Sequence, residues 1–282
     1  MAARSPKLPQ RRPSLISVPA YDYRVYHLTL AERLVYGLLA LTVGGAIGYL
    51  FFGGLATDAD GHATVATYVL NGIAVGVPAI FATRTFLRVR TEQIRATKVR
   101  TLETQFRDML DSLSVSLASG GTVIQGFNAA RSDMERQYAA DAPIVQELNL
   151  IIAGFHNSIR VEDMLTDLGE RSGSDDVASF ANVFRIAYLR GADMKQAVQN
   201  THVVISEKMA ISAEIETSLV AGKNESFIMV AIPIVLVGIL KSGGGGFADA
   251  LRTPVGVMST MAAVALFVAA YVMARKIMSI KF

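Results

Sequence analysis

The stretch VYGLLALTVGGAIGYLFFGGLAT, residues Val35–Thr57, contains no charged side chain. Three further stretches lack Asp, Glu, Lys and Arg in the same way, and they cover residues 63–83, 226–240 and 253–274. A helix needs about 20 predominantly apolar residues to cross a hydrocarbon core of about 30 Å. The first, second and fourth stretches reach that length. They indicate a chain that passes through a membrane several times.

The third apolar stretch, 226–240, is the shortest of the four. As a helix of about 15 residues it would measure only about 22 Å. Lys223 and Lys241 flank it, and long cationic side chains of this kind reach toward the membrane surface. A buried core helix is the alternative interpretation. The companion stretch 253–274 and the polar loop between them favour a membrane hairpin, so we predict four spans.

The composition agrees with a membrane protein and excludes several kinds of site. The chain has 282 residues, of which 51% are hydrophobic and 18% charged, and its mean hydropathy is +0.37; soluble domains carry about 25% charged residues. There is no Cys, which excludes disulfides, zinc–thiolate sites, iron–sulfur clusters and cysteine nucleophiles. Four scattered His residues leave little for a histidine-based metal site.

Residues 1–33 form a basic leader with four prolines before the first span. No small-residue cleavage site stands out, and the apolar core begins too late for a cleaved signal peptide. Because charge and proline disfavour a packed core, we expect this leader to be disordered. The predicted organisation is therefore a leader, a transmembrane hairpin over 34–83, a helical domain over 84–225 and a second hairpin over 226–282 with a short basic C-terminus.

The basic residues predict the orientation of the spans. A membrane-surface basic band follows the second span and consists of Arg84, Arg88, Arg90, Arg95, Lys98 and Arg100. Arg275, Lys276 and Lys281 follow the fourth span, whereas the loop between the first two spans carries only Asp58, Asp60 and His62. Lys and Arg accumulate in short cytoplasmic flanks. Both termini and the central domain are therefore expected in the cytoplasm, with the basic band beside anionic lipid headgroups.

The central segment, 84–225, has helical periodicity throughout. Apolar residues recur every three or four positions along three stripes. The first stripe is Phe106, Met109, Leu110, Leu113 and Leu117; the second is Val177, Phe180, Val183, Phe184, Ala187 and Tyr188; the third starts at Met194 and runs toward the third span. Helix-ending residues separate them, namely Gly120–Gly121, Pro143, Gly154, Gly173 and Gly191. We predict an all-α membrane protein whose cytoplasmic part is a bundle of about six helices, the last continuous with or close to span three.

The charge and motifs of this segment point away from catalysis. Residues 101–225 contain 10 basic and 18 acidic side chains, a net charge of −8, which disfavours nucleic acid and suits either a basic partner or simply a solvated surface. Gly121–Gly126 has the glycine spacing of a phosphate loop, but Phe127–Asn128 stand where Lys and Ser/Thr are required. Asp175–Asp176 fit the start of a helix better than a metal pair. The four spans contain no ionisable residue, which disfavours an ion path. We predict no catalytic residue, no metal and no cofactor, and hence no enzyme.

Four segments occur in an order typical of a known family. They are LSVSLASGG (113–121) leading into 123–130, VEDML (161–165) with Leu168, YLRGADM (188–194) through Ala197, and GKNES (222–226) before Pro233. In this order they resemble the type II secretion system F family of GspF-like platform proteins. The span layout is most similar to the TadB-type subunits of tight-adherence (Flp) pili. Gly126 departs from the family, which usually has Ala there, and larger members carry two copies of the domain where this chain has one.

The resemblance implies a structural role in a bacterial or archaeal inner (plasma) membrane. Such a multi-pass platform couples a cytoplasmic secretion ATPase to the assembly of pilin or to secretion. The single domain copy implies a homologous second subunit and a homo- or hetero-oligomer; lipid is the remaining partner and nucleic acid is not one. The candidates for contact with the ATPase are acids near helix starts: Glu162, Asp163, Asp167, Glu170, Asp175 and Asp176.

Two other functions compete with this interpretation. A flagellar-stator-like energy-transducing subunit also places a cytoplasmic domain between spans two and three, but it needs long third and fourth spans. A membrane sensor or signalling scaffold would need a nucleotide pocket or phospho-acceptor site, for which the sequence offers no motif. The platform is the preferred hypothesis because the helical segments and the span order agree with it.

Overall fold

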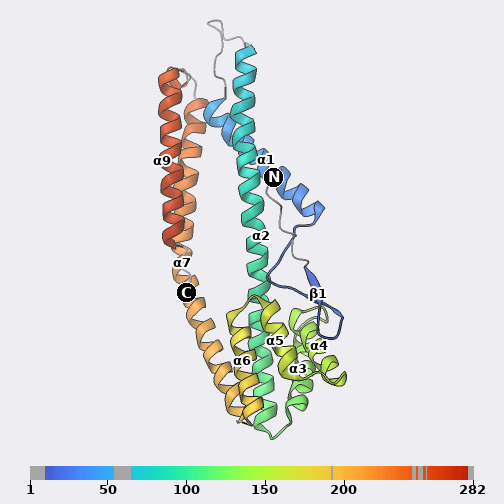
Figure 1. The fold of residues 1–282 in the computed structure, drawn as a ribbon. Coiled ribbons are helices and arrows are strands. Elements are labelled where there is room, and N and C mark those ends of the chain that lie inside the picture. Colours follow the sequence, from blue (N-terminus) through green and yellow to red (C-terminus); the bar gives the residue numbers. More distant parts are fainter. Residues whose placement is uncertain are drawn as a thin grey trace. The chain divides into compact units, whose positions relative to one another are not determined.

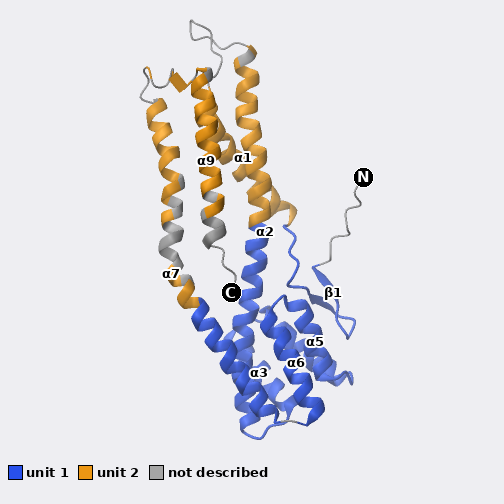
Figure 2. Cartoon of the chain, turned by 60° about the vertical axis from the view of Figure 1, so that its left-hand side comes forward, with its two compact units in different colours: residues 1–28, 90–212 blue, residues 29–89, 213–282 orange. Residues whose placement is uncertain are grey.

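The computed structural model describes residues 10–53, 65–191, 193–242, 246, 250–251 and 253–278. The chain divides into two compact units, which Figure 2 distinguishes by colour. Unit 1 contains residues 1–28 and 90–212, and unit 2 contains residues 29–89 and 213–282. The predicted loop around 58–62, most of the loop over 243–252 and the first nine residues lie outside the described part of the chain.

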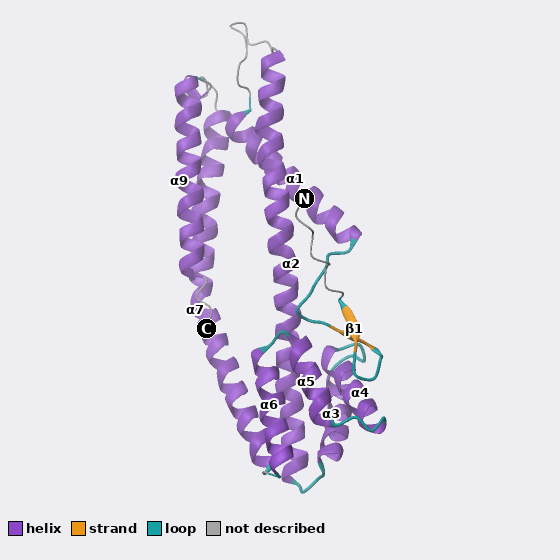
Figure 3. Ribbon diagram, in the orientation of Figure 1, coloured by secondary structure: helices purple, strands orange, loops and turns teal. Residues whose placement is uncertain are grey.

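The described part is almost entirely helical, as predicted (Figures 1 and 3). Its helices are α1 (Leu30–Phe52), α2 (Val65–Ala118), α3 (Val123–Gln137), α4 (Pro143–His156), α5 (Val161–Ser172), α6 (Asp175–Arg190), α7 (Met194–Ser242) and α9 (Pro254–Met278). Two short strands, β1 (Arg11–Pro13) and β2 (Pro19–Tyr21), pair antiparallel, with Arg11 opposite Tyr21 and Pro13 opposite Pro19. The last bundle helix and the third apolar stretch belong to one continuous helix, α7.

Local sequence signals explain where the helices of unit 1 begin and end. Thr122 and Gln125 form a capping box at the start of α3, in which each side chain bonds the other's backbone N–H. Pro143 occupies the first turn of α4, where its missing N–H costs nothing. Helices α5 and α6 end at glycines in the left-handed conformation, Gly173 (φ +68°) and Gly191 (φ +63°), which residues with a Cβ adopt only with strain.

The core of unit 1 forms where the apolar stripes of α2 and α6 meet the other helices. Phe106 packs edge-on against Phe180 with ring centroids 5.3 Å apart, and Phe127 packs in the same way on Phe184. The stripe predicted for α6 needs correction at two residues, because Val183 and Tyr188 are 42% and 48% exposed, and Ala181 is buried instead. At 3.6 residues per turn Ala181 lies about 40° from Val177 around the helix, whereas Val183 lies about 120° from it. Tyr188 is in the last turn of α6.

The amino-terminal segment differs from the expectation of disorder over 1–33. From Gln10 onward it folds against unit 1 as a strand pair closed by the turn between Pro13 and Pro19, and Tyr23 joins the apolar core with 6% exposure. The prolines flank the turn, where they fix the backbone rather than prevent structure. Helix α1 then begins at Leu30 behind a capping box formed by Thr29 and Glu32.

Unit 2 contains the apolar parts of the long helices. Two helical segments, Leu30–Phe52 and Thr67–Ala118, are long and apolar enough to cross a membrane by length and composition, and two shorter apolar helices cover Ala231–Lys241 and Val255–Ala270. These findings agree with membrane association.

Helices α1 and α2 approach closely through glycines of α1. Gly44, Gly45 and Gly48 are buried in the contact, as expected for small residues between apolar helices. A Cβ on Gly48 would clash with the Ala74 carbonyl oxygen and would lie 2.9 Å from Cγ of Pro78. Ala74 lies four residues before Pro78, whose ring nitrogen has no hydrogen to donate to that carbonyl. The absence of a side chain at Gly48 therefore leaves room for a carbonyl that the proline has freed.

We expect Gly48→Ala to destabilise unit 2 by about 1–3 kcal/mol, the usual cost of overpacking, because the clash is with backbone. Gly76→Ala in α2 is the matched control, since a Cβ there meets nothing within 4 Å, and its higher helix propensity should stabilise by up to about 1 kcal/mol. Thermal unfolding of both variants in detergent, followed by circular dichroism, measures the difference. Equal midpoints for the two variants would contradict the proposed packing.

Candidate interaction site on the helical unit

The six predicted contact acids do not lie together in the structure. Asp163, Asp167 and Glu170 share one face of α5 and are called here the acidic face. Together with Leu15, Ile159 and Thr166 they line an open hollow. The acidic face is therefore the part of the predicted set that forms one surface.

The other three acids are placed differently. Glu162 has 2% exposure, so it lacks the surface position that a docking acid requires, although it is in the first turn of α5 as predicted. Asp175 is exposed, and Asp176 bonds Nζ of Lys208 on α7 at 2.7 Å. Both lie in the first turn of α6 behind the N-cap residue Ser174, where negative charge is favourable.

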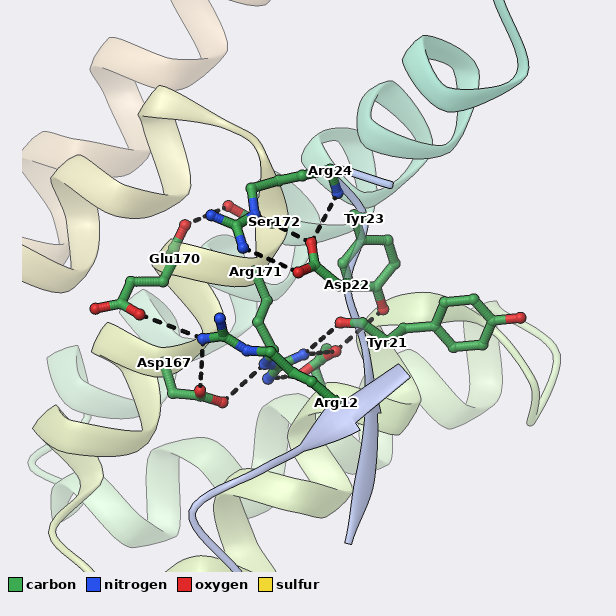
Figure 4. A network of polar contacts seen from close by, with 11 residues as sticks. Arg12, Tyr21, Asp22, Tyr23, Arg24, Asp167, Glu170, Arg171 and Ser172 are labelled. Atoms are coloured by element: carbon green, nitrogen blue, oxygen red, sulfur yellow. Dashed lines mark hydrogen bonds and ion pairs between the residues drawn. The ribbon is translucent and has the colours of Figure 1, made fainter. Parts of the chain in front are cut away.

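The amino-terminal segment supplies a cation to the acidic face (Figure 4). Nη2 of Arg12 lies 3.2 Å from Oε2 of Glu170 and 3.4 Å from Oδ1 of Asp167. The Glu170 side chain is 63% exposed and that of Arg12 32%. Ion pairs at such exposure contribute little to stability because water and salt compete with them.

Beneath this surface lies a buried group of polar side chains, called here the clamp: Tyr23, Glu147, Asp167 and Arg171. The Arg171 guanidinium bonds both carboxylate oxygens of Glu147, at 2.9 and 2.7 Å. Its Nε bonds Oδ2 of Asp167 at 2.7 Å, and Nη1 also bonds the Tyr21 carbonyl at 2.8 Å. The side chains of Arg171 and Glu147 are only 1% and 2% exposed. Charges so far from water are tolerated only when they are paired and hydrogen-bonded.

Tyr23 connects the amino-terminal segment to the clamp. Its hydroxyl donates to Oε1 of Glu147 at 3.1 Å, and its backbone N–H donates to the Arg171 carbonyl at 2.9 Å. Burial raises the pKa of the Tyr23 phenol, and the neighbouring Glu147 charge raises it further. Burial would lower the pKa of Arg171, but the hydrogen bonds and charges of Glu147 and Asp167 outweigh it and raise that pKa. Tyr23 and Arg171 therefore keep their protons and act as hydrogen-bond donors to the clamp carboxylates. The clamp in this way joins the amino-terminal segment to α4 and α5.

Asp22 and Arg24 extend these contacts to the end of α5. The Arg24 side chain makes two bonds to the Asp22 carboxylate, at 3.1 and 2.9 Å. Burial opposes ionisation of Asp22, yet the hydrogen bonds and charge of Arg24 lower its pKa. Arg24 also packs over Gly173, where a Cβ would meet its Cγ at 3.0 Å. The segment from residue 20 to 24 thus fits the carboxyl end of α5 closely.

The predicted basic band lies along α2, and part of it contacts the chain itself. Nζ of Lys98 lies over the rings of Tyr21 and Tyr26, at 5.5 and 4.6 Å from their centroids. Arg95 forms an ion pair with Glu92, while Arg84, Arg88 and Arg100 are exposed. Lys98 therefore helps to hold the amino-terminal segment, a role that charge counting alone did not indicate.

Unit 2 contains a second hollow of a different chemical kind. It measures about 480 Å³ and is lined by α1, α2, α7 and α9, mainly with aliphatic and phenylalanine side chains. Ser259 and Thr260 are the polar lining residues, and the Thr260 hydroxyl donates to the Gly256 carbonyl. Among the described residues, no group of three or more His, Asp or Glu is arranged to hold a metal ion.

The amino-terminal segment is a structural element that its charge and proline content did not predict. The pair of prolines around a five-residue stretch, followed by Tyr21, Asp22 and Tyr23, is a signal for a turn and a packed segment.

A scan against protein-family models and searches of curated proteins and of solved structures found no match.

We expect Arg171→Met to destabilise the chain by about 3–5 kcal/mol, because it leaves the buried Glu147 carboxylate without its cation. The double variant Glu147→Leu/Arg171→Met should recover part of that loss, since the buried Glu147 charge is then removed as well, while Asp167 keeps its contact with Arg12 and some access to water. Arg190→Met, at an exposed position of α6, is the matched control and should change little. Denaturant unfolding of the full chain in detergent provides the measurement, and a double variant no more stable than Arg171→Met would refute the charge argument.

Proposed function

We propose that the chain is an inner-membrane platform subunit, similar to TadB-type proteins, of a type IV pilus-like or type II secretion-like machine. In this proposal it crosses a bacterial or archaeal plasma membrane four times with both termini in the cytoplasm. It couples a cytoplasmic secretion ATPase to pilin assembly or secretion and works with a homologous second subunit in an oligomer. It has no catalytic role of its own.

The observation that carries the proposal is the continuity of two long helices. Helix α2 has 54 residues and α7 has 49, and each contributes residues to both units. Each also contains one of the apolar stretches. A hydrogen-bonded helix is a stiff element through which a displacement in one part reaches another. A subunit that converts motion of a partner into motion within the bilayer needs such elements.

The acidic face supports a contact with a basic partner. Its exposed members are Asp163 and Glu170, with 39% and 63% of their side chains accessible. Asp167 is 10% exposed and bound to Arg171, so it contributes charge more than direct contact. We therefore narrow the proposed ATPase contact to Asp163 and Glu170, and we withdraw Glu162 from it because that side chain is buried.

One observation favours the stator-like alternative. The short third apolar stretch was an argument against it, yet this stretch belongs to the 49-residue helix α7, which has the length that a stator requires. The absence of ionisable residues from the four apolar stretches still disfavours an ion-driven machine. The platform therefore remains the preferred function.

Affinity purification of the tagged full chain from solubilised membranes tests both functions. We expect a secretion ATPase and a homologous second subunit to accompany the chain. Asp163→Lys/Glu170→Lys should lower recovery of the ATPase by more than about tenfold, because like charges across an interface are repulsive. Asp141→Lys/Glu207→Lys is the control, with the same charge change at exposed positions elsewhere on unit 1. Recovery of a single-span, peptidoglycan-binding partner would support the stator instead.

The absence of Cys allows a clean test of the topology. Single cysteines at Asp60 and Gly245 should react with a membrane-impermeant maleimide in intact spheroplasts, because both positions lie in predicted outer loops. Ser119→Cys, at an exposed position of unit 1, should react only after permeabilisation. Labelling of Ser119→Cys in intact spheroplasts would contradict the proposed orientation.

A further inference from the structure

The outward side of α6 carries aliphatic side chains where a solvated helix carries polar ones. Val183, Ile186 and Leu189 are 42%, 52% and 64% exposed, and their three-residue spacing makes them neighbours along the helix surface. Helix α3 of the same unit differs. Its exposed positions are all polar, namely Gln125, Asn128, Ser132, Glu135, Arg136 and Gln137. A contiguous exposed apolar stripe marks an interaction surface, whereas scattered single residues do not.

The apolar surface continues from α6 onto α7. Nζ of Lys208 on α7 bonds Oδ1 of Asp176 on α6 at 2.7 Å, so these two side chains mark where the helices meet. Val183 lies two turns after Asp176, and Val204 lies one turn before Lys208. Both are therefore on the same sides of their helices as the bonded pair. Because Val204 is 62% exposed, aliphatic side chains of both helices border this contact.

The stripe is accompanied by cations that have no acid to pair with. Residues 177–195 contain one acid, Asp193, which accepts a hydrogen bond from the α7 backbone. The basic residues of this range are all exposed, and they are Arg185, Arg190 and Lys195. Among the residues that the structure describes, no acid forms an ion pair with any of them. Other arginines of unit 1 each contact an acid, as in the case of Arg24, Arg107, Arg131, Arg136 and Arg160.

These features favour an acidic, amphipathic helix as the partner. Aliphatic side chains spaced by three or four residues on such a helix pack against an apolar stripe, and Asp or Glu beside them pair with the guanidinium groups. An anionic membrane surface is a poorer match. Residues 101–225 contain 10 basic and 18 acidic side chains, so a broad anionic surface is repelled. A single helix senses mainly the nearby cations, because salt screens charges beyond about 8–10 Å.

We propose that an acidic amphipathic helix of a partner protein docks on the outer surface of α6. The docking surface consists of Val183, Arg185, Ile186, Leu189 and Arg190. The partner's aliphatic side chains cover the stripe, and its carboxylates pair with the two guanidinium groups. The contact proposed for the ATPase on α5 uses other residues, so neither assignment depends on the other.

Two designed peptides test the chemistry of the docking surface. Each is an amphipathic helix of about 20 residues, long enough to be helical in water, with leucines along one face and either glutamates or lysines beside them. The full-length protein is placed in nanodiscs of neutral lipid, and fluorescence anisotropy measures binding. We expect the glutamate peptide to bind with a dissociation constant below about 100 µM. The lysine peptide should bind at least about tenfold more weakly, because like charges repel. Weaker binding of the glutamate peptide, or equal affinities for the two peptides, would overturn the proposal.

Charge reversal locates the binding on α6. Arg185→Glu/Arg190→Glu should weaken binding of the glutamate peptide more than about tenfold. Arg136→Glu/Arg160→Glu is the matched control, since it makes the same charge change at side chains that are 76% and 65% exposed on α3 and at the start of α5. The control should bind the peptide like the unaltered protein. Equal affinities for the two variants would place the peptide elsewhere and overturn the proposal.

The apolar stripe is tested in the same assay. Ile186→Gln/Leu189→Gln should weaken binding at least about tenfold, because the bound helix then buries less apolar surface. Val115→Gln/Phe155→Gln replaces exposed apolar side chains on α2 and α4 and should have little effect. All four positions are exposed, so the folded core is unchanged. An Ile186→Gln/Leu189→Gln protein that binds as tightly as its control would also overturn the docking surface.

A photo-activated cross-linker identifies the natural occupant in cells that produce the full chain. Benzoylphenylalanine in place of Leu189 should capture a protein, and mass spectrometry should locate the cross-link in a helix with aliphatic and acidic side chains on one face. The same group in place of Ser132, on the polar outer side of α3, should not capture that helix. Cross-links between two copies of this chain, to lipid or to a segment without acids would overturn the proposal.

Discussion

The bond between Arg171 and Glu147 holds unit 1 together at the point where three separate parts of the chain meet. Arg171 is near the end of α5, Glu147 is in α4, and the amino-terminal segment reaches the same place through Tyr21 and Tyr23. Because neither charge would be stable alone at this depth, the three parts can occupy their final positions only when this ion pair is formed. The surrounding apolar contacts are less directional and do not specify the arrangement so strictly.

This requirement explains the two environments found on α5. Asp167 lies one turn before Arg171 on α5. It accepts a hydrogen bond from Arg171 on the buried side of the helix and one from Arg12 on the exposed side. The contact with Arg171 is 2.7 Å long and buried, whereas the contact with Arg12 is 3.4 Å long and more accessible to water. The same helix therefore serves as a structural element on one side and as an accessible charged surface on the other, and Asp167 connects the two.

Much of the fold of unit 1 could be predicted because its signals are local. Apolar stripes at helical spacing, the Thr122 capping box and the glycines after α5 and α6 act within a few residues. The amino-terminal segment could not be predicted in the same way, since Tyr23 bonds a residue 124 positions away and the Tyr21 carbonyl one 150 positions away. Glu162 shows a related limit: its place in a first turn follows from electrostatics, but its burial depends on which side of α5 the other helices cover.

Unit 1 contains two separate ranges of the chain, residues 1–28 and 90–212. This limits how many times the chain between them can cross a bilayer. Residues 20–24 share one core with α4 and α5, so both must be on the same side of any membrane. The intervening chain, 29–89, must then cross an even number of times. A single crossing is incompatible with the clamp, whatever the hydropathy of α1 and α2. The nascent amino terminus must also wait for α5 to be synthesised before its tyrosine finds a partner, so unit 1 completes its folding only after α5 has been made.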